Sequence, residues 1–235
     1  MLFGRKQKSL SVRRGVCDDW ISALPREKSQ LFETVVRRWE ATYAMMSIAL
    51  DEALSLRARG ELVCARQQIS IVAELLVRLA GTLIGACDAM SNRGRHISAL
   101  PVVAPLNVDF FRGDTAQSAA SWNGLLHHVL LGDRSRFFYK LKILSGTVQN
   151  VTQEFCDAAQ DISEGNSTQP GACWTAVDSL HYDLNTCLRE TEVVFKSFLH
   201  ALPDNQVSSF ANKLNAPAPP LRLTSARQRL TRVSA

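Results

Sequence analysis

Apolar residues recur along four long stretches of this chain at alternating steps of three and four positions. This spacing keeps one face of a helix apolar over its whole length, which is typical of helices that pack side by side. The stripes run from Phe32 to Ala53, from Leu62 to Met90, from Phe137 to Ile162 and from Trp174 to Leu202. Each helix would be about 45 Å long at the usual rise per residue. The pattern therefore predicts an all-α protein, an antiparallel four-helix bundle.

Glycine and proline mark the expected ends of these helices. Pro25 suits the first turn of the first helix, and Gly60 separates the first helix from the second. Asp133 suits the N-cap of the third helix. Gly165 ends that helix, and a turn at Pro170-Gly171 leads into the fourth. The two short connections, at Gly60 and at 165–171, predict antiparallel neighbours in each half of the bundle.

Smaller elements are expected around the bundle. Two short accessory helices are predicted at 114–131 and 203–214, and both ends of the chain are expected to be disordered. The connection at 93–113 is long and apolar, so it either packs across the bundle surface or acts as a lid or partner-binding segment. The apolar residues of this candidate partner-binding loop are Val102, Val103, Leu106, Phe110 and Phe111.

Positive charge is concentrated at the two ends of the chain. Nine of the 27 basic residues lie in 1–16 and 216–235, which hold no acidic residue, so the middle has 18 basic and 22 acidic residues. We therefore expect a helical domain at 17–215 between two basic arms. Such arms attract anionic partners, either nucleic acid or a lipid surface, without sequence readout. The candidate anion-binding residues are Arg5, Lys6, Lys8, Arg13, Arg14, Arg222, Arg227, Arg229 and Arg232.

Targeting and redox features favour a cytoplasmic protein. The first 20 residues lack the apolar core of a secretory signal. The longest weakly polar run, Leu79–Cys87, is about half as long as a membrane span, so no transmembrane segment is expected. The six cysteines have no CxxC-type spacing, which argues against a zinc or dithiol site.

Histidine is the residue most often used for proton transfer and metal binding near neutral pH. His127 and His128 are adjacent, so on a helix they diverge by about 100° and cannot serve one site. His181 instead occupies a position on an apolar stripe, between Val177 and Leu184. A buried histidine needs partners for its ring nitrogens, so His181 is the candidate for binding a small ligand or cofactor.

Motifs for common chemistries are missing from the sequence. There is no Glu-x-x-His for a di-iron bundle, no G-x-S-x-G and no phosphate-binding glycine loop. We therefore expect no catalytic residue, no metal and no cofactor. The predicted function is a non-enzymatic interaction or scaffold protein that binds a protein partner or itself. The alternatives are anionic binding by the arms and a ligand near His181.

Overall fold

The computed structural model describes residues 24–97, 134–165, 170–216, 221 and 223. Within these residues the chain forms helices and no strands. The elements are α2 (Arg26–Ala58), α3 (Leu62–Gly94), α5 (Arg134–Glu164), α6 (Pro170–Ala201), a 3-10 turn η3 (Asp204–Gln206) and α7 (Val207–Leu214). The predicted all-α bundle of four long helices is confirmed.

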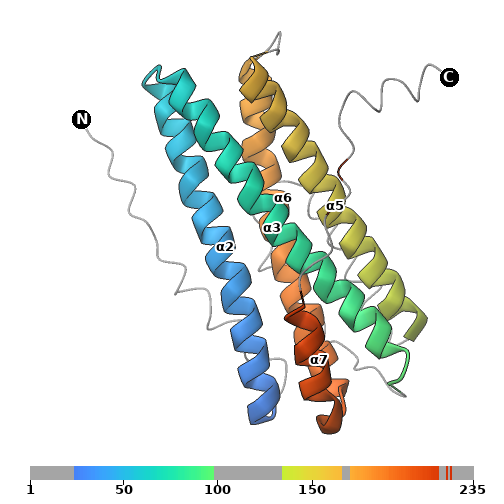
Figure 1. The fold of residues 1–235 in the computed structure, drawn as a ribbon. Coiled ribbons are helices and arrows are strands. Elements are labelled where there is room, and N and C mark those ends of the chain that lie inside the picture. Colours follow the sequence, from blue (N-terminus) through green and yellow to red (C-terminus); the bar gives the residue numbers. More distant parts are fainter. Residues whose placement is uncertain (1–23, 98–133, 166–169, 217–220, 222, 224–235) are drawn as a thin grey trace, which may run out of the picture.

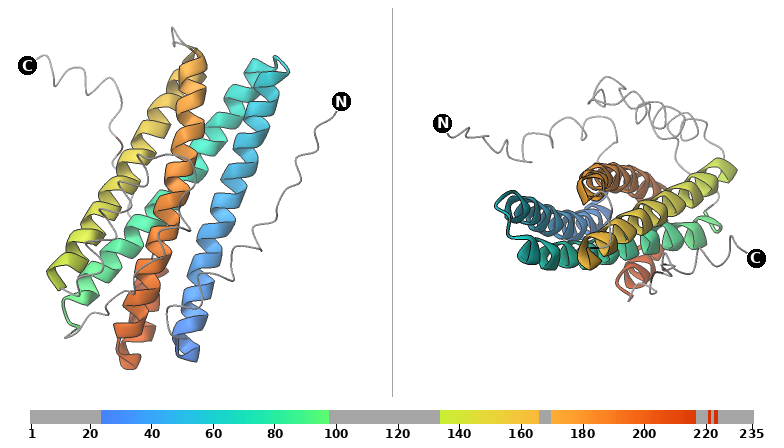
Figure 2. Two further views of the ribbon diagram at one scale, coloured as in Figure 1. Left: turned by 180° about the vertical axis from the view of Figure 1, so that it is seen from behind. Right: turned by 90° about the horizontal axis from the view of Figure 1, so that it is seen from above.

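The four long helices form two antiparallel hairpins (Figure 1). One hairpin joins α2 to α3 and the other joins α5 to α6, with both hairpin tips at the same end of the molecule (Figure 2). Gly60 turns the first hairpin with a φ of 80°, in the left-handed region that glycine adopts without strain. The helix α3 contacts all three of the other long helices, most extensively α2 and α5, and α6 makes smaller contacts with both α2 and α3.

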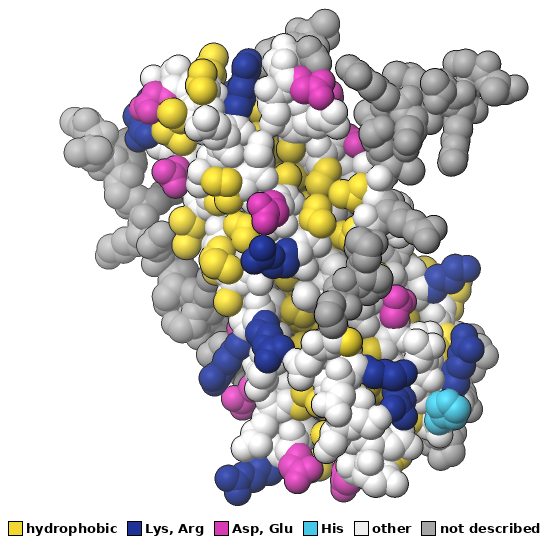
Figure 3. Space-filling model, viewed as in Figure 1, with side chains coloured by type: hydrophobic (Ala, Val, Ile, Leu, Met, Phe, Trp, Pro, Cys, Tyr) yellow, Lys and Arg dark blue, Asp and Glu magenta, His cyan; other side chains and the backbone are white. Residues whose placement is uncertain are grey.

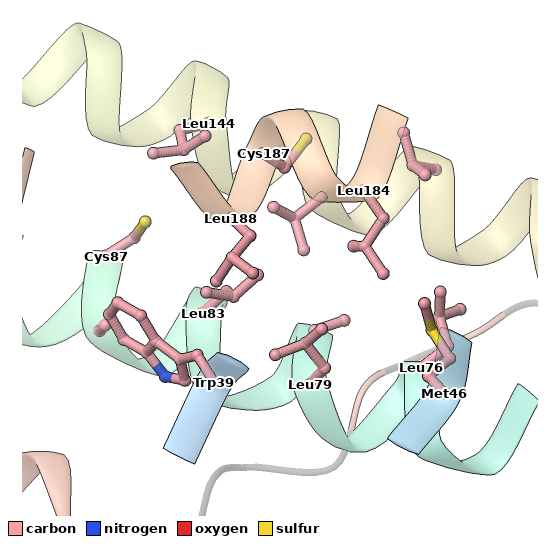
Figure 4. Close-up of a cluster of buried hydrophobic side chains, with 14 of the residues drawn as sticks. Trp39, Met46, Leu76, Leu79, Leu83, Cys87, Leu144, Leu184, Cys187 and Leu188 are labelled. Atoms are coloured by element: carbon pink, nitrogen blue, oxygen red, sulfur yellow. The ribbon is translucent and has the colours of Figure 1, made fainter. Parts of the chain in front are cut away.

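The predicted stripes form the core between the hairpins. Figure 4 shows Trp39 and Met46 of α2 facing leucines of α3, α5 and α6. Leu76 and Leu79 of α3 are fully buried, as is Phe155 of α5. Leu62 is the stripe residue that stays in solvent, with 52% of its surface exposed, because it begins α3 at the hairpin tip.

By composition alone, α3 includes an 18-residue stretch apolar enough to cross a membrane, and 44% of that stretch is buried inside the bundle. A core helix of a soluble protein has the same composition, so this observation is weak evidence for a span. The buried positions of α3 contact the other helices, and this packing accounts for its apolar face.

The end of the bundle opposite the hairpin tips is closed by aromatic rings and by α7. Phe210 of α7 lies with its ring centroid 4.9 Å from that of Phe198 and 6.1 Å from that of Phe195. Polar contacts tie the same region to the bundle, since the Arg38 guanidinium donates to the side-chain amide oxygen Oδ1 of Asn215 at 2.6 Å. Buried Lys28 pairs with Asp204 at 3.0 Å.

Several predicted boundaries shift by a few residues. Pro25 precedes α2 rather than lying in its first turn, and Pro170 begins α6 rather than forming a turn before it. Proline is tolerated there because the first amide of a helix has no intrahelical partner. In the predicted helix at 203–214, the α-helix begins only at Val207, after the turn η3. The helix predicted at 114–131 lies outside the described residues.

Leucine-to-alanine changes in α3 test the core. Leu76→Ala should lower the free energy of unfolding by about 2–5 kcal/mol, because Leu76 is fully buried and a cavity would remain. Leu62→Ala removes the same atoms from a half-exposed side chain in the same helix, so we expect a loss below about 1 kcal/mol. Urea denaturation of both variants measures the difference, and equal losses would contradict this core.

Candidate functional site

His181 lies on α6 at the boundary with α2 and is buried, with 8% of its surface exposed. The Tyr43 hydroxyl of α2 lies 3.1 Å from His181 Nε2, within hydrogen-bond distance. The two rings are nearly parallel, at 6° between planes and 5.1 Å between centroids. The other ring nitrogen, Nδ1, is buried without a hydrogen-bond partner. The seam position predicted for this histidine is therefore correct, and one of its nitrogens remains unpaired.

Polar residues continue from His181 along the same side of α6. Asn185 follows one turn later, and its side-chain carbonyl oxygen is also buried and unpaired. Arg189 follows after another turn and donates to Glu40 of α2 at 3.2 Å and to Glu192 at 2.9 Å. We call this contact between α2 and α6, from Tyr43 and His181 to Arg189, the polar seam.

Burial decides the charge state at the polar seam. Desolvation raises the pKa of the Tyr43 hydroxyl. Desolvation also lowers the pKa of His181, and the nearby carboxylates of Asp178 and Asp51 oppose that decrease only in part. Both groups are therefore neutral at pH 7. The two unpaired atoms could hold a water or a small polar molecule. The described residues contain no group of three or more His, Cys, Asp or Glu side chains that could hold a metal.

A second buried polar pair lies between α5 and α6. Lys140 is 4% exposed and Glu190 is 5% exposed. Desolvation raises the pKa of the Glu190 carboxyl to about 7, and the attraction of Lys140 acts in the opposite direction. Burial lowers the pKa of Lys140 as well. Both shifts favour the uncharged forms of two groups that attract each other when charged.

Two buried thiols lie near this pair, on α3 and α6 (Figure 4). Burial, with smaller contributions from nearby acidic groups that include Glu190, raises the pKa of both Cys87 and Cys187 to about 12. The thiolate is the nucleophilic form of cysteine, so these two residues are unreactive packing groups at neutral pH.

Large apolar side chains are exposed on the outer side of the first hairpin. Ile48 is 68% exposed, Met45 is 50% exposed and Ile71 of α3 is 48% exposed. Figure 3 shows hydrophobic side chains gathered over the upper halves of α2 and α3. A hydrogen bond of 3.3 Å from Gln68 to Glu52 crosses between the helices on this side and fixes which residues lie level with each other.

The residues on this side form four layers, because each helix repeats at steps of three and four from the Glu52–Gln68 contact. The first layer is the observed Glu52–Gln68 contact. Counted from it, the helical repeat aligns Ile48 with Ile71, Met45 with Leu75, and Ala41 with Arg78, in order away from the hairpin tip. We call these eight residues the hairpin face.

The structure places only one of the predicted site residues. That residue is His181, which belongs to the described part of the chain. The basic arms, the apolar residues of the 93–113 connection from Val102 to Phe111, and His127–His128 all lie outside the described residues. The first residues of that connection are helical instead, because α3 continues to Gly94. Buried positions of α3 extend to that residue.

Sequence reasoning missed the hairpin face and the Lys140–Glu190 pair. The hairpin face had a detectable signal, because Ala41, Met45 and Ile48 are apolar at positions that do not belong to the core stripe of α2. Lys140 and Glu190 had no such signal, since each is simply the neighbour of a stripe residue, Leu141 or Thr191.

The pKa of His181 predicts a loss of stability in acid. Its folded-state pKa is lowered, so as the pH falls the unfolded chain takes up this proton first. Stability should therefore decrease as the pH falls below about 6.5, the unfolded value. His181→Gln should lose less stability than wild type between pH 7 and pH 5 in urea denaturation. Tyr43→Phe retains the histidine, so it should keep the wild-type loss.

Glu190 predicts the opposite trend with pH. Its folded-state pKa is raised to about 7, so its favourable contribution is complete below about 4.3, the unfolded value, and is lost as the pH rises through 7. Glu190→Gln removes this titration, and the variant should gain stability relative to wild type between pH 5 and pH 8. A difference in stability between Glu190→Gln and wild type that stays constant with pH would contradict the raised pKa of Glu190. Glu33→Gln, at an exposed position of α2, is the control.

No protein-family model, curated protein or solved structure matches this chain. No residue role can therefore be transferred from a relative. The function has to follow from the contacts, burial and charges of the chain's own side chains.

Proposed function

We propose that this protein is a non-enzymatic interaction module that binds another protein surface through its hairpin face. The observation that carries this proposal is the exposure of Met45, Ile48 and Ile71 on adjacent turns of two packed helices. Apolar surface in contact with water is unfavourable, and contiguous apolar patches rimmed by polar residues typically mark protein interaction sites.

The arrangement of the hairpin face favours a protein over a small molecule. Small ligands bind in concave sites that surround most of their surface. The hairpin face instead consists of the outer sides of two helices, which can pack against other helices through ridges and grooves. By contrast, Tyr139 of α5 and Tyr182 of α6 are exposed aromatic residues away from the hairpin face, and scattered exposed apolar residues are normal.

The other hypotheses have less support in the described residues. A ligand near His181 is favoured by two buried unpaired polar atoms, but buried water commonly satisfies such atoms in proteins. Catalysis would need an activated group, but the buried thiols of Cys87 and Cys187 are protonated at neutral pH. Binding of nucleic acid or a lipid surface by the basic arms stays a prediction.

Photo-cross-linking in the producing cell tests the proposal. Benzoylphenylalanine in place of Ile48 should give a protein adduct of defined mass, because this side chain is exposed at the centre of the proposed contact. The same group in place of Tyr182, which is 64% exposed on α6, is a size-matched control and should not give that adduct. Denaturing electrophoresis and mass spectrometry identify the products.

A second substitution makes the test specific to the hairpin face. Ile71→Asp introduces a charge beside position 48 at a half-exposed site, so the fold should persist while the adduct is lost. The proposal would be contradicted by the same adducts from positions 48 and 182, by adducts with lipid in place of protein, or by an adduct that survives Ile71→Asp.

A further inference from the structure

We infer that the partner of the hairpin face is a second copy of this chain, bound antiparallel about a two-fold axis through the centre of the face. The inference rests on the proposed function and specifies its partner. It follows from the order of charged and apolar layers along the hairpin.

The hairpin face has a different charge at each end. The layer nearest the hairpin tip contains the Glu52 carboxylate, and the layer farthest from it contains the Arg78 guanidinium. The two middle layers are apolar: Ile48, Ile71 and Met45 are exposed, and Leu75 is partly buried against the core. Neither charge is held firmly within its own chain. The Arg78–Glu74 pair is 3.4 Å apart with both side chains more than 60% exposed, and the Glu52–Gln68 contact is 3.3 Å long.

A two-fold axis perpendicular to the helices reverses the order of the layers in the second copy. When the axis passes between the two apolar layers, Ile48 and Ile71 of one copy face Met45 and Leu75 of the other. Glu52 then faces the layer of Ala41 and Arg78 at one end of the contact, and the same pair forms again at the other end. The small Ala41 side chain leaves space for Glu52 to approach the guanidinium.

This reversal is what a self-complementary contact requires. In an isologous dimer, residue i of one copy contacts residue j of the other, and j contacts i. A face with an apolar centre, one acidic end and one basic end pairs opposite charges only in the antiparallel orientation. A parallel two-fold copy would place Glu52 over Gln68 and Arg78 over Ala41, so each charge would lie in a layer without the opposite charge. The charges therefore select the orientation, while the apolar layers provide most of the affinity.

Sedimentation equilibrium on the full chain tests the inference. The wild type should associate from the 26.0 kDa chain to twice that mass as concentration rises. Glu52→Arg and Arg78→Glu should each weaken the dimer by about tenfold or more, because each places like charges together at both ends. The double variant restores both pairs with their signs exchanged, so its dissociation constant should return to within about threefold of wild type.

Mixing the two single variants gives a sharper result. A Glu52→Arg chain has arginine at both ends and an Arg78→Glu chain has glutamate at both ends, so the mixture should form a heterodimer in preference to either homodimer. Fluorescence energy transfer between labelled chains measures this preference. Ile48→Asp should abolish association, and Tyr182→Asp, a change at an exposed residue of α6, should leave it unchanged.

The outcomes separate this inference from the proposed function. A wild-type chain that stays monomeric at every concentration, or a mixture without a preferred heterodimer, overturns the second-copy inference. If the cross-linker at position 48 then captures a different protein and loses it with Ile71→Asp, the interaction function stands with another partner. If it captures neither a copy nor another protein, both proposals fail.

Discussion

The burial of the apolar stripe of α3 is the interaction on which the rest of the bundle depends. Leu76, Leu79 and Leu83 are fully buried because α3 lies against α2, α5 and α6 together. The helices α2 and α5 need α3 to cover their own stripes, since both make their largest contact with it, whereas α6 packs chiefly on α5. The apolar interior is therefore organised around α3. The polar seam and the Lys140–Glu190 pair lie at contacts between the other helices.

The polar seam gives the contact between α2 and α6 a defined register. Apolar helices can slide past each other at modest cost, because one leucine resembles the next. A buried polar pair restricts that freedom, since a misplaced partner leaves an unsatisfied donor or acceptor. Tyr43 with His181, and Glu40 with Arg189, join these two helices at two levels. We expect their role to be the selection of one alignment more than the addition of stability.

The fold was predictable because its signal is repeated along each helix. A stripe such as Val177, His181, Leu184 and Leu188 places each residue with respect to its neighbours, so His181 could be assigned to the interior without knowledge of the partner helix. Its contact with Tyr43 could not be predicted, because a stripe does not show which helix it faces. The burial of Lys140 and Glu190 depends on how each helix is rotated about its own axis. An apolar stripe defines that rotation only to within about one residue position.

The hairpin face shows a different limit. Its apolar positions are visible in the sequence, but a core stripe on the same helix already explains why α2 is amphipathic. A second repeat on the far side of a helix adds little to a fold prediction. It becomes informative once the first repeat is known to be buried and Ile48 is found 68% exposed.

The antiparallel arrangement also has a consequence for the order in which the bundle assembles. The α2–α3 pairing closes across a short turn at Gly60, and the α5–α6 pairing also joins consecutive helices, so both hairpins can form from local contacts. Tyr43 and His181 are separated by 138 positions, and the chain between them must lose conformational freedom before they meet. The polar seam is thus expected to close late in folding, when α3 has already brought the two hairpins together.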